Sequence, residues 1–148
     1  FCRRGGNILV SGAFVGTDLW DSPYATEEDR RWAMETLKYR WRNNNGAVTG
    51  QVKSVSSPFP ALQGDYRYYN ELDSESYVVE NPDAIEPADE RAFTIFRYAE
   101  NNLSAGIFYR GEQYSTCILG FPLEAIRGQE NRNKLMGSIL ETMNGNVR

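Results

Sequence analysis

The sequence predicts a three-layer α/β domain, in which helices cover a mixed sheet that has a parallel part and an antiparallel extension. Three observations lead to this prediction. A short, continuous apolar run at residues 7–11 is typical of a strand inside a parallel sheet. Aromatic and β-branched segments separated by short turns fill the later half of the chain. Apolar stripes with helical spacing follow the first strand and close the sequence. The 148 residues suit a single domain, 1–148.

The first strand is expected over residues 7–11, between a pair of glycines and Gly12. Its apolar residues do not alternate with polar ones, which indicates burial on both faces of the sheet. A buried parallel strand needs parallel neighbours, and the chain offers few candidates before it. We therefore expect the earlier half of the domain to lie upstream of Phe1, in a multidomain precursor.

A helix is expected to begin after Thr26, because Asp29 three residues later completes a capping-box pattern. Apolar residues at 33, 37 and 41 are spaced to form one face of this helix. The run Asn-Asn-Asn-Gly at 43–46 is expected to end it, since Asn and Gly accept the left-handed conformation.

Five further strands are expected after this helix. Two half-buried strands are predicted at 47–55 and 65–72, joined by a loop with two prolines. The other three are predicted at 92–99, 105–110 and 114–122. The last two are close enough to form an antiparallel hairpin with its turn at 111–113. The apolar stripe at 131–143 predicts a final helix.

The composition restricts the function more than the fold. The chain has no histidine, which removes the commonest general base and metal ligand and lowers the expectation of an enzyme. A formal net charge of -4 argues against nucleic acid as a partner. No apolar run is long enough to span a bilayer, so we expect no membrane insertion. We also expect no cofactor and no metal.

Two cysteines, Cys2 and Cys117, are too few for a disulfide framework and are not spaced like a metal site. Each is interpreted as a small apolar residue, and Cys117 lies within a strand pattern. A bridge between them stays open, because the sequence does not give their separation in space.

The segment Gly-Ala-Phe-Val-Gly at 12–16 has the form of a nucleophile elbow, Gly-x-nucleophile-x-Gly, but Phe14 stands at the reactive position. Ser11 is out of register and has no histidine to activate it, so it is interpreted as a strand-end serine. The amides that begin the next helix could still hold an anion. This alternative makes the following residues candidate ligand-binding residues: Ser11, Gly12, Gly16, Thr17 and Asp18.

A strand followed by Gly-x-Cys-x-Gly, and later a strand followed by Phe-His-Pro-Glu, is the pattern of class I glutamine amidotransferase domains. Residues 12–16 resemble the first motif, and Phe-Pro-Leu-Glu at 121–124 resembles the second. The resemblance implies a flavodoxin-like sheet and a Cys-His-Glu triad. Phe14 stands where the family has Cys and Pro122 where it has His, so Glu124 alone remains. Because triad members act as a unit, we expect no catalytic residue here.

The segments 5–22, 77–87, 105–110 and 120–126 together resemble one subgroup more closely. These are amidotransferase-like domains in large secreted or envelope proteins of Bacteroidetes-type bacteria, labelled xanthan lyases or grouped with golvesin-type modules. The similarity covers almost the whole chain and corresponds to the later part of that domain. It implies a secreted or envelope location, with other domains of the same precursor and carbohydrate as partners.

Two clusters of side chains remain. Eight carboxylates with no intervening Lys or Arg lie between 71 and 90; we interpret them as a solvated loop, because the order of an EF-hand is missing. Within this run Asp83 is expected to cap or fold a turn. Most of the aromatic residues are explained as core by strand alternation. A sugar-stacking platform is the alternative, and its candidates are Tyr68, Arg97 and Tyr109.

Three functions stay open at this stage. The first is a non-catalytic module that serves structure, docking or glycan contact. The second is part of a polysaccharide lyase of the xanthan type, in which a Tyr base would abstract a proton and an Arg would neutralise a uronate. The third is a small-ligand or anion site at residues 12–18.

Overall fold

A computed structural model describes residues 1–145 as a mixed α/β fold built around a curled, mixed six-stranded sheet. The strand order is β1-β8-β7-β6-β3-β4, and β2 and β5 form a separate two-stranded sheet. The strands are β1 (Ile8–Ser11), β2 (Tyr39–Asn43), β3 (Gln51–Ser54), β4 (Asp65–Arg67), β5 (Ala84–Pro87), β6 (Ala92–Tyr98), β7 (Ser104–Arg110) and β8 (Ser115–Leu119). The α-helices are α1 (Thr17–Trp20), α2 (Glu27–Trp32) and α3 (Gln129–Asn144).

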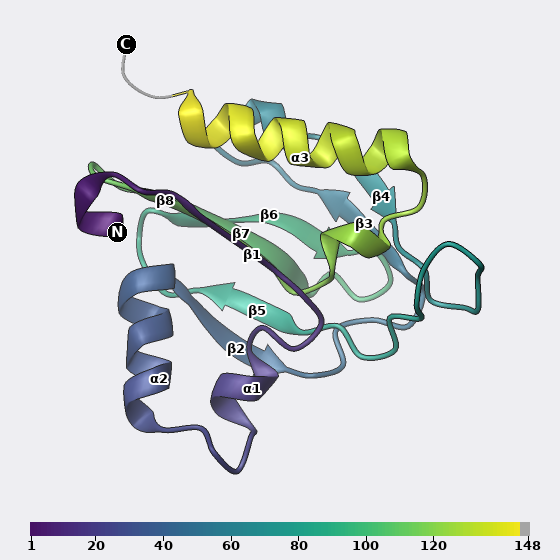
Figure 1. Ribbon diagram of the computed structural model, residues 1–148, viewed down its shortest axis with the longest axis horizontal. Coiled ribbons are helices and arrows are strands. Elements are labelled where there is room, and N and C mark those ends of the chain that lie inside the picture. Colours follow the sequence, from purple (N-terminus) through teal and green to yellow (C-terminus); the bar gives the residue numbers. More distant parts are fainter. Residues whose placement is uncertain (146–148) are drawn as a thin grey trace.

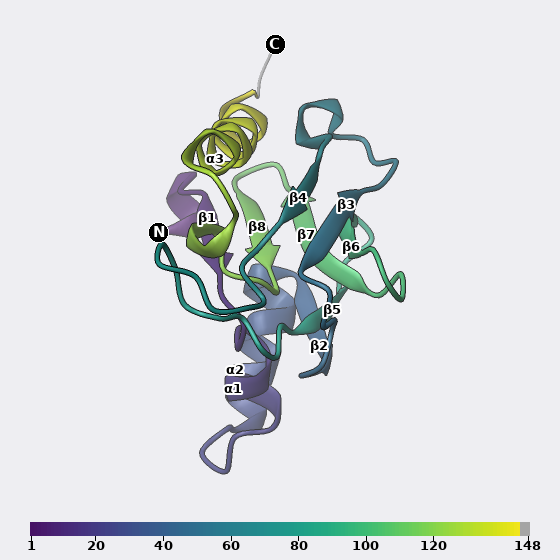
Figure 2. The ribbon, with the colours of Figure 1, turned by 90° about the vertical axis from the view of Figure 1, so that its right-hand side faces the viewer.

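Both faces of the main sheet are covered. Figure 1 shows α3 along one face, with α1, α2 and the β2–β5 sheet on the opposite side, and Figure 2 shows the same arrangement after a quarter turn. The α3 side buries Leu135, Ile139 and Met143 in the larger hydrophobic core. The other side has a smaller core, in which Leu37 and Ile85 are buried with residues of β7 and β8.

The final helix and the β7–β8 hairpin confirm two predictions. Apolar side chains of α3 pack on the sheet as the 131–143 stripe indicated. β7 and β8 pair antiparallel across the short turn that begins at Gly111. β3 and β4 also form within the predicted segments, although both are shorter than expected.

The first strand differs from its prediction. β1 pairs in parallel with β8, from Ile8 opposite Thr116 to Ser11 opposite Leu119, and this is the one parallel pair in the described part of the chain. β1 lies at the edge of the sheet, and all four of its residues are half-buried. Both faces of β1 contact apolar core, since Leu9 packs against the larger core and Ile8 and Val10 pack against the smaller one. The burial is only partial because β1 is an edge strand, which an apolar run does not distinguish from a central one.

The first helix is shorter than predicted. Its capping box is confirmed, since Thr26 Oγ1 accepts from Asp29 N at 3.2 Å and Thr26 N donates to Asp29 Oδ2 at 2.9 Å. A π-helical turn continues the helix to Leu37, and Lys38 then adopts a left-handed conformation with φ 70°. This reverses the chain into β2, so Trp41 lies on a strand rather than on the helix.

The acidic run differs from its prediction as a solvated loop only in its later part, since residues 71–81 form no helix or strand and are mostly exposed. β5 forms within it and pairs antiparallel with β2. Asp83, which precedes β5, is completely buried. Ala84 and Ile85 next to it are buried too, and this apolar pair was the overlooked sign of a strand.

One ion pair of this segment gives a prediction about pH. Lys38 Nζ lies 3.1 Å from Asp89 Oδ2, with both side chains largely shielded from solvent. Burial alone would raise the pKa of Asp89, but hydrogen bonds from the Arg91 amide and from Lys38 lower it below its ordinary value of 3.8. Because the folded pKa is the lower one, Asp89 stabilises the fold above its ordinary pKa and loses this effect as the pH falls through the folded pKa.

Asp89→Asn is therefore expected to lower the free energy of unfolding by about 1 kcal/mol near neutral pH. Urea denaturation should give a smaller difference from the wild type at about pH 3 than at about pH 7. The control is Asp65→Asn, at an exposed position on β4. An equal difference at both pH values would contradict this account of the ion pair.

Candidate functional site

The two motifs singled out in the sequence lie side by side. They follow β1 and β8, whose carboxyl ends lie together because the strands are parallel. The Gly12 amide donates to the Leu119 carbonyl at 3.2 Å. Ser11 Oγ accepts from the Leu123 amide at 2.6 Å and lies 3.4 Å from the Phe121 carbonyl oxygen, to which it donates. Ser11 therefore joins the two segments, in agreement with its interpretation as a structural strand-end serine.

The three positions compared with a triad have different surroundings. Phe14 is 51% exposed. Pro122 is buried at the start of the short turn 123–125. Glu124 is exposed and accepts a hydrogen bond from Tyr77 Oη at 2.8 Å. Phe14 and Pro122 offer no atom that can attack a carbonyl or transfer a proton.

A buried carboxylate occupies the start of α1. Asp83 Oδ2 accepts from the amides of Gly16 at 2.6 Å and Thr17 at 2.8 Å. Asp83 Oδ1 accepts from Thr17 Oγ1 at 2.5 Å and from Trp41 Nε1 at 3.2 Å. The expectation that Asp83 caps a turn is met, but the turn lies 66 residues earlier in the chain.

These bonds change the interpretation of residues 12–18 as an anion site. Burial raises the pKa of Asp83 above its ordinary value, and the four hydrogen-bond donors offset only part of this effect. The sequence suggested that amides at the start of this helix could hold an anion. The amides of Gly16 and Thr17 already donate to the Asp83 carboxyl group, so they are not open to an external anion. Among the other candidates, Asp18 is exposed and Gly12 is half-buried.

The structure does not support the sugar-stacking platform that the sequence offered as an alternative. Tyr68 is 1% exposed and Tyr109 is 4% exposed, so neither ring can form a stacking platform on the surface. Tyr68 stacks instead on Phe121, with ring centroids 5.9 Å apart. Arg97 is half-buried and lines a separate groove.

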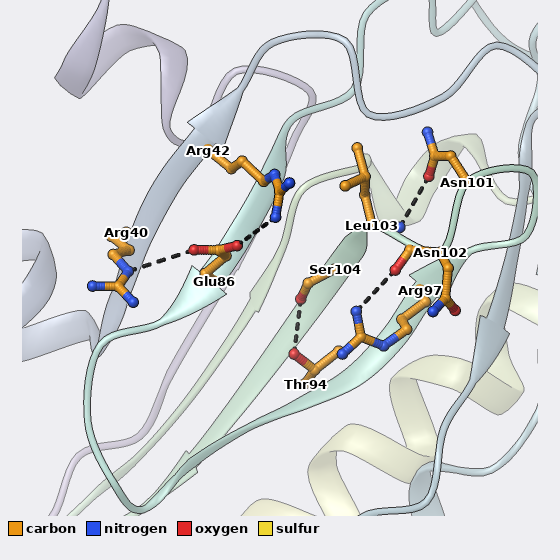
Figure 3. Close-up of polar contacts among 9 residues, drawn as sticks. All are labelled: Arg40, Arg42, Glu86, Thr94, Arg97, Asn101, Asn102, Leu103 and Ser104. Atoms are coloured by element: carbon orange, nitrogen blue, oxygen red, sulfur yellow. Dashed lines mark hydrogen bonds and ion pairs between the residues drawn. The ribbon is translucent and has the colours of Figure 1, made fainter.

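This second region, which we call the arginine groove, has a volume of about 380 Å³. Its walls come from the β2–β5 sheet and the β6–β7 hairpin (Figure 3). It is lined by Arg40, Arg42, Glu86, Pro87, Thr94, Arg97, Asn102, Leu103 and Ser104. Of these residues the sequence singled out only Arg97 as a candidate. The alternation of exposed arginines in Tyr-Arg-Trp-Arg-Asn at 39–43 was the signal that could have indicated the others.

The described residues, 1–145, hold no cluster suited to a metal ion, since no three His, Cys, Asp or Glu side chains in this range lie close enough together. Cys2 and Cys117 are both free, and Cys117 is buried, which raises its pKa well above the usual range. None of the helices in this range has the length and apolar character that a bilayer crossing requires.

Comparisons with protein-family models, curated proteins and solved structures find no match to this chain. The resemblance to amidotransferases therefore rests on the two motifs and on their position next to each other.

Proposed function

We propose that this chain is a non-catalytic, amidotransferase-like module with a degenerate Cys-His-Glu triad at Phe14, Pro122 and Glu124. It serves structure, docking or glycan contact within a secreted or envelope protein that handles polysaccharide. In this proposal its sheet is the later part of a flavodoxin-like domain, and its partners are other domains of the same precursor and carbohydrate.

The observation that carries the proposal is the position of the Asp83 carboxylate. Acyl transfer needs free hydrogen-bond donors where negative charge develops on the substrate. Here the first amides of α1, from Gly16 and Thr17, donate to Asp83 instead. An oxyanion formed beside them would meet the carboxyl oxygens of Asp83 rather than free donors. The amides at the start of α1 thus join this helix to the segment before β5, which is a structural role.

The contacts around Ser11 give independent support. A nucleophilic serine needs a base that removes its proton. Ser11 Oγ instead accepts from one backbone amide and donates to a backbone carbonyl, both in the 121–124 motif. These bonds join β1 to the segment after β8, which is a structural role.

The alternative, part of a xanthan-type polysaccharide lyase with a Tyr base and an Arg, has less support. A general base needs a pKa near the working pH. Tyr77 is the exposed tyrosine that contacts Glu124, and burial together with the hydrogen bond to Glu124 raises its pKa to about 12. That arrangement retains the phenolic proton and opposes proton abstraction.

The test measures turnover and binding with the same preparation. We expect no ammonia release from glutamine, and no unsaturated product from a uronate polymer, above the buffer control. A glycan array should detect binding of the same protein. Turnover of either substrate that scales with protein concentration, and that persists after repurification, would contradict the non-catalytic role.

A further inference from the structure

We infer that the arginine groove is a binding site for a small polar molecule that carries an oxyanion, either a carboxylate or a phosphate group. The groove is formed by β2, β5, β6 and β7, and not by the segments after β1 and β8. The inference is therefore independent of the proposed amidotransferase-like role, and either one can fail without the other.

The charge of the groove is opposite to that of the chain. Three guanidinium groups line it, whereas Glu86 is its one carboxylate. Glu86 is shared between Arg42, with Nη1 to Oε1 at 2.8 Å, and Arg40, with Nε to Oε2 at 3.6 Å. An excess of two positive charges remains in a protein of formal net charge -4. An anion can reduce this excess by binding between the guanidinium groups.

Arg97 has donors left for a ligand. Its Nη1 donates to the Asn102 carbonyl at 2.8 Å, a neutral acceptor in the β6–β7 turn. A guanidinium has five N–H donors, and no other hydrogen bond or ion pair of this side chain occurs within the described residues. The bond to Asn102 orients the planar group, which reduces the entropy that a ligand must overcome.

An irregularity in β6 brings Arg97 and Thr94 to the same groove. Residues three apart on a regular strand point to opposite faces of the sheet. In β6 the pairing with β7 shifts between Thr94 and Phe96 and again between Phe96 and Arg97, and two consecutive residues, Ile95 and Phe96, are buried. Such bulges redirect side chains and occur often beside functional sites.

A pair of hydroxyl groups adds one donor for the polar part of a ligand. Thr94 Oγ1 and Ser104 Oγ lie 3.0 Å apart, and Figure 3 shows them between Glu86 and Arg97. One hydroxyl donates to the other, so the accepting hydroxyl keeps its own proton for a further bond. Arginine forks match the geometry of carboxylate and phosphate oxygens, which defines the expected ligand class.

Calorimetric titration at low ionic strength tests the inference with three probes: gluconate, glucose 6-phosphate and neutral glucose. We expect heat of binding with at least one of the two anions, weaker binding when salt is added, and none with glucose. Binding of gluconate alone would identify a carboxylate site, and binding of glucose 6-phosphate alone a phosphate site. Absence of binding by both anions, or equal binding of glucose, would overturn the inference.

Three variants assign the binding to the groove. Arg42→Gln and Arg97→Gln should each weaken binding of the anion about tenfold, because each removes a charged donor. Arg42 is more than half exposed, so its replacement should leave the fold intact. Arg31→Gln is the control, since Arg31 is exposed on α2 and carries the same charge. Equal affinities of the Arg42 variant and this control would refute the site.

Discussion

Asp83→Ala is expected to lower the free energy of unfolding by about 4 kcal/mol, which is a large part of the stability of a domain of this size. The variant leaves the amides of Gly16 and Thr17 without an acceptor, together with the Thr17 hydroxyl and the Trp41 indole N–H. Each buried donor that loses its partner costs about 1–3 kcal/mol, and solvent entry recovers part of this sum.

The Asp83 carboxylate also joins elements that are distant in the sequence. It connects the start of α1 to Trp41 on β2, while its own backbone pairs with Gly120 after β8. Tyr98 on β6 donates to its carbonyl at 2.7 Å. Loss of the carboxylate should therefore weaken the packing of α1, β2 and the end of β8 against one another, and not only α1.

Urea denaturation followed by tryptophan fluorescence measures this effect. Asp83→Asn keeps one oxygen acceptor, so it should cost about half as much as Asp83→Ala. The control Asp21→Ala changes an exposed acid at the end of α1 and should stay within about 0.5 kcal/mol of the wild type. If Asp83→Ala is as stable as this control, the carboxylate has no structural role.

Gly120→Ala is expected to have the second largest effect, about 3 kcal/mol or more. A Cβ at this position would lie 2.1 Å from the carbonyl oxygen of Asp83, which is a backbone atom. The strand end has little freedom to move away. The Gly120 amide donates to the Ala105 carbonyl at 2.9 Å, and the Gly120 carbonyl accepts from the Asp83 amide at 2.9 Å.

The matched control is another Gly→Ala change. Gly137 lies in α3, and a Cβ there would meet no atom within 4 Å. Because alanine favours a helix more than glycine does, Gly137→Ala should raise the stability by about 0.5–1 kcal/mol. In thermal unfolding, the melting temperature of Gly120→Ala should therefore fall and that of Gly137→Ala should rise. A small change in melting temperature for Gly120→Ala would show that the backbone around Asp83 and Gly120 can move to accommodate the Cβ, which would contradict the prediction.

Much of the fold could be predicted from local patterns. The capping box of α2, the stripe of α3 and the β7–β8 hairpin depend on residues that are near one another in sequence. The end of the first helix could not be predicted in this way. The spacing of Ala33, Leu37 and Trp41 fits a helix, but Tyr39 and Trp41 also alternate with exposed arginines, as a strand requires. Packing against β5 decides between the two.

The candidate sites were harder to predict than the fold, because their residues come together through contacts between distant parts of the sequence. Asp83 was visible only as one acid among eight, because its donors lie in segments up to 67 residues away. Arg97 was a candidate beside two tyrosines that are buried, whereas four of the residues that line the groove with it come from the distant strands β2 and β5. The β6 irregularity that redirects Thr94 leaves no pattern in the sequence that strand alternation would detect.

The parallel pairing of β1 with β8 has a consequence for synthesis of the chain. β1 is made first, but its partner at Thr116 follows more than a hundred residues later. β6, β7 and β8 are consecutive and can pair as soon as they leave the ribosome. Among the described residues β8 is the strand that pairs with β1, so this ladder can form only after β8 has emerged. Among the pairings of the main sheet, this one joins the residues that are farthest apart in the sequence, so we expect it to form late in folding.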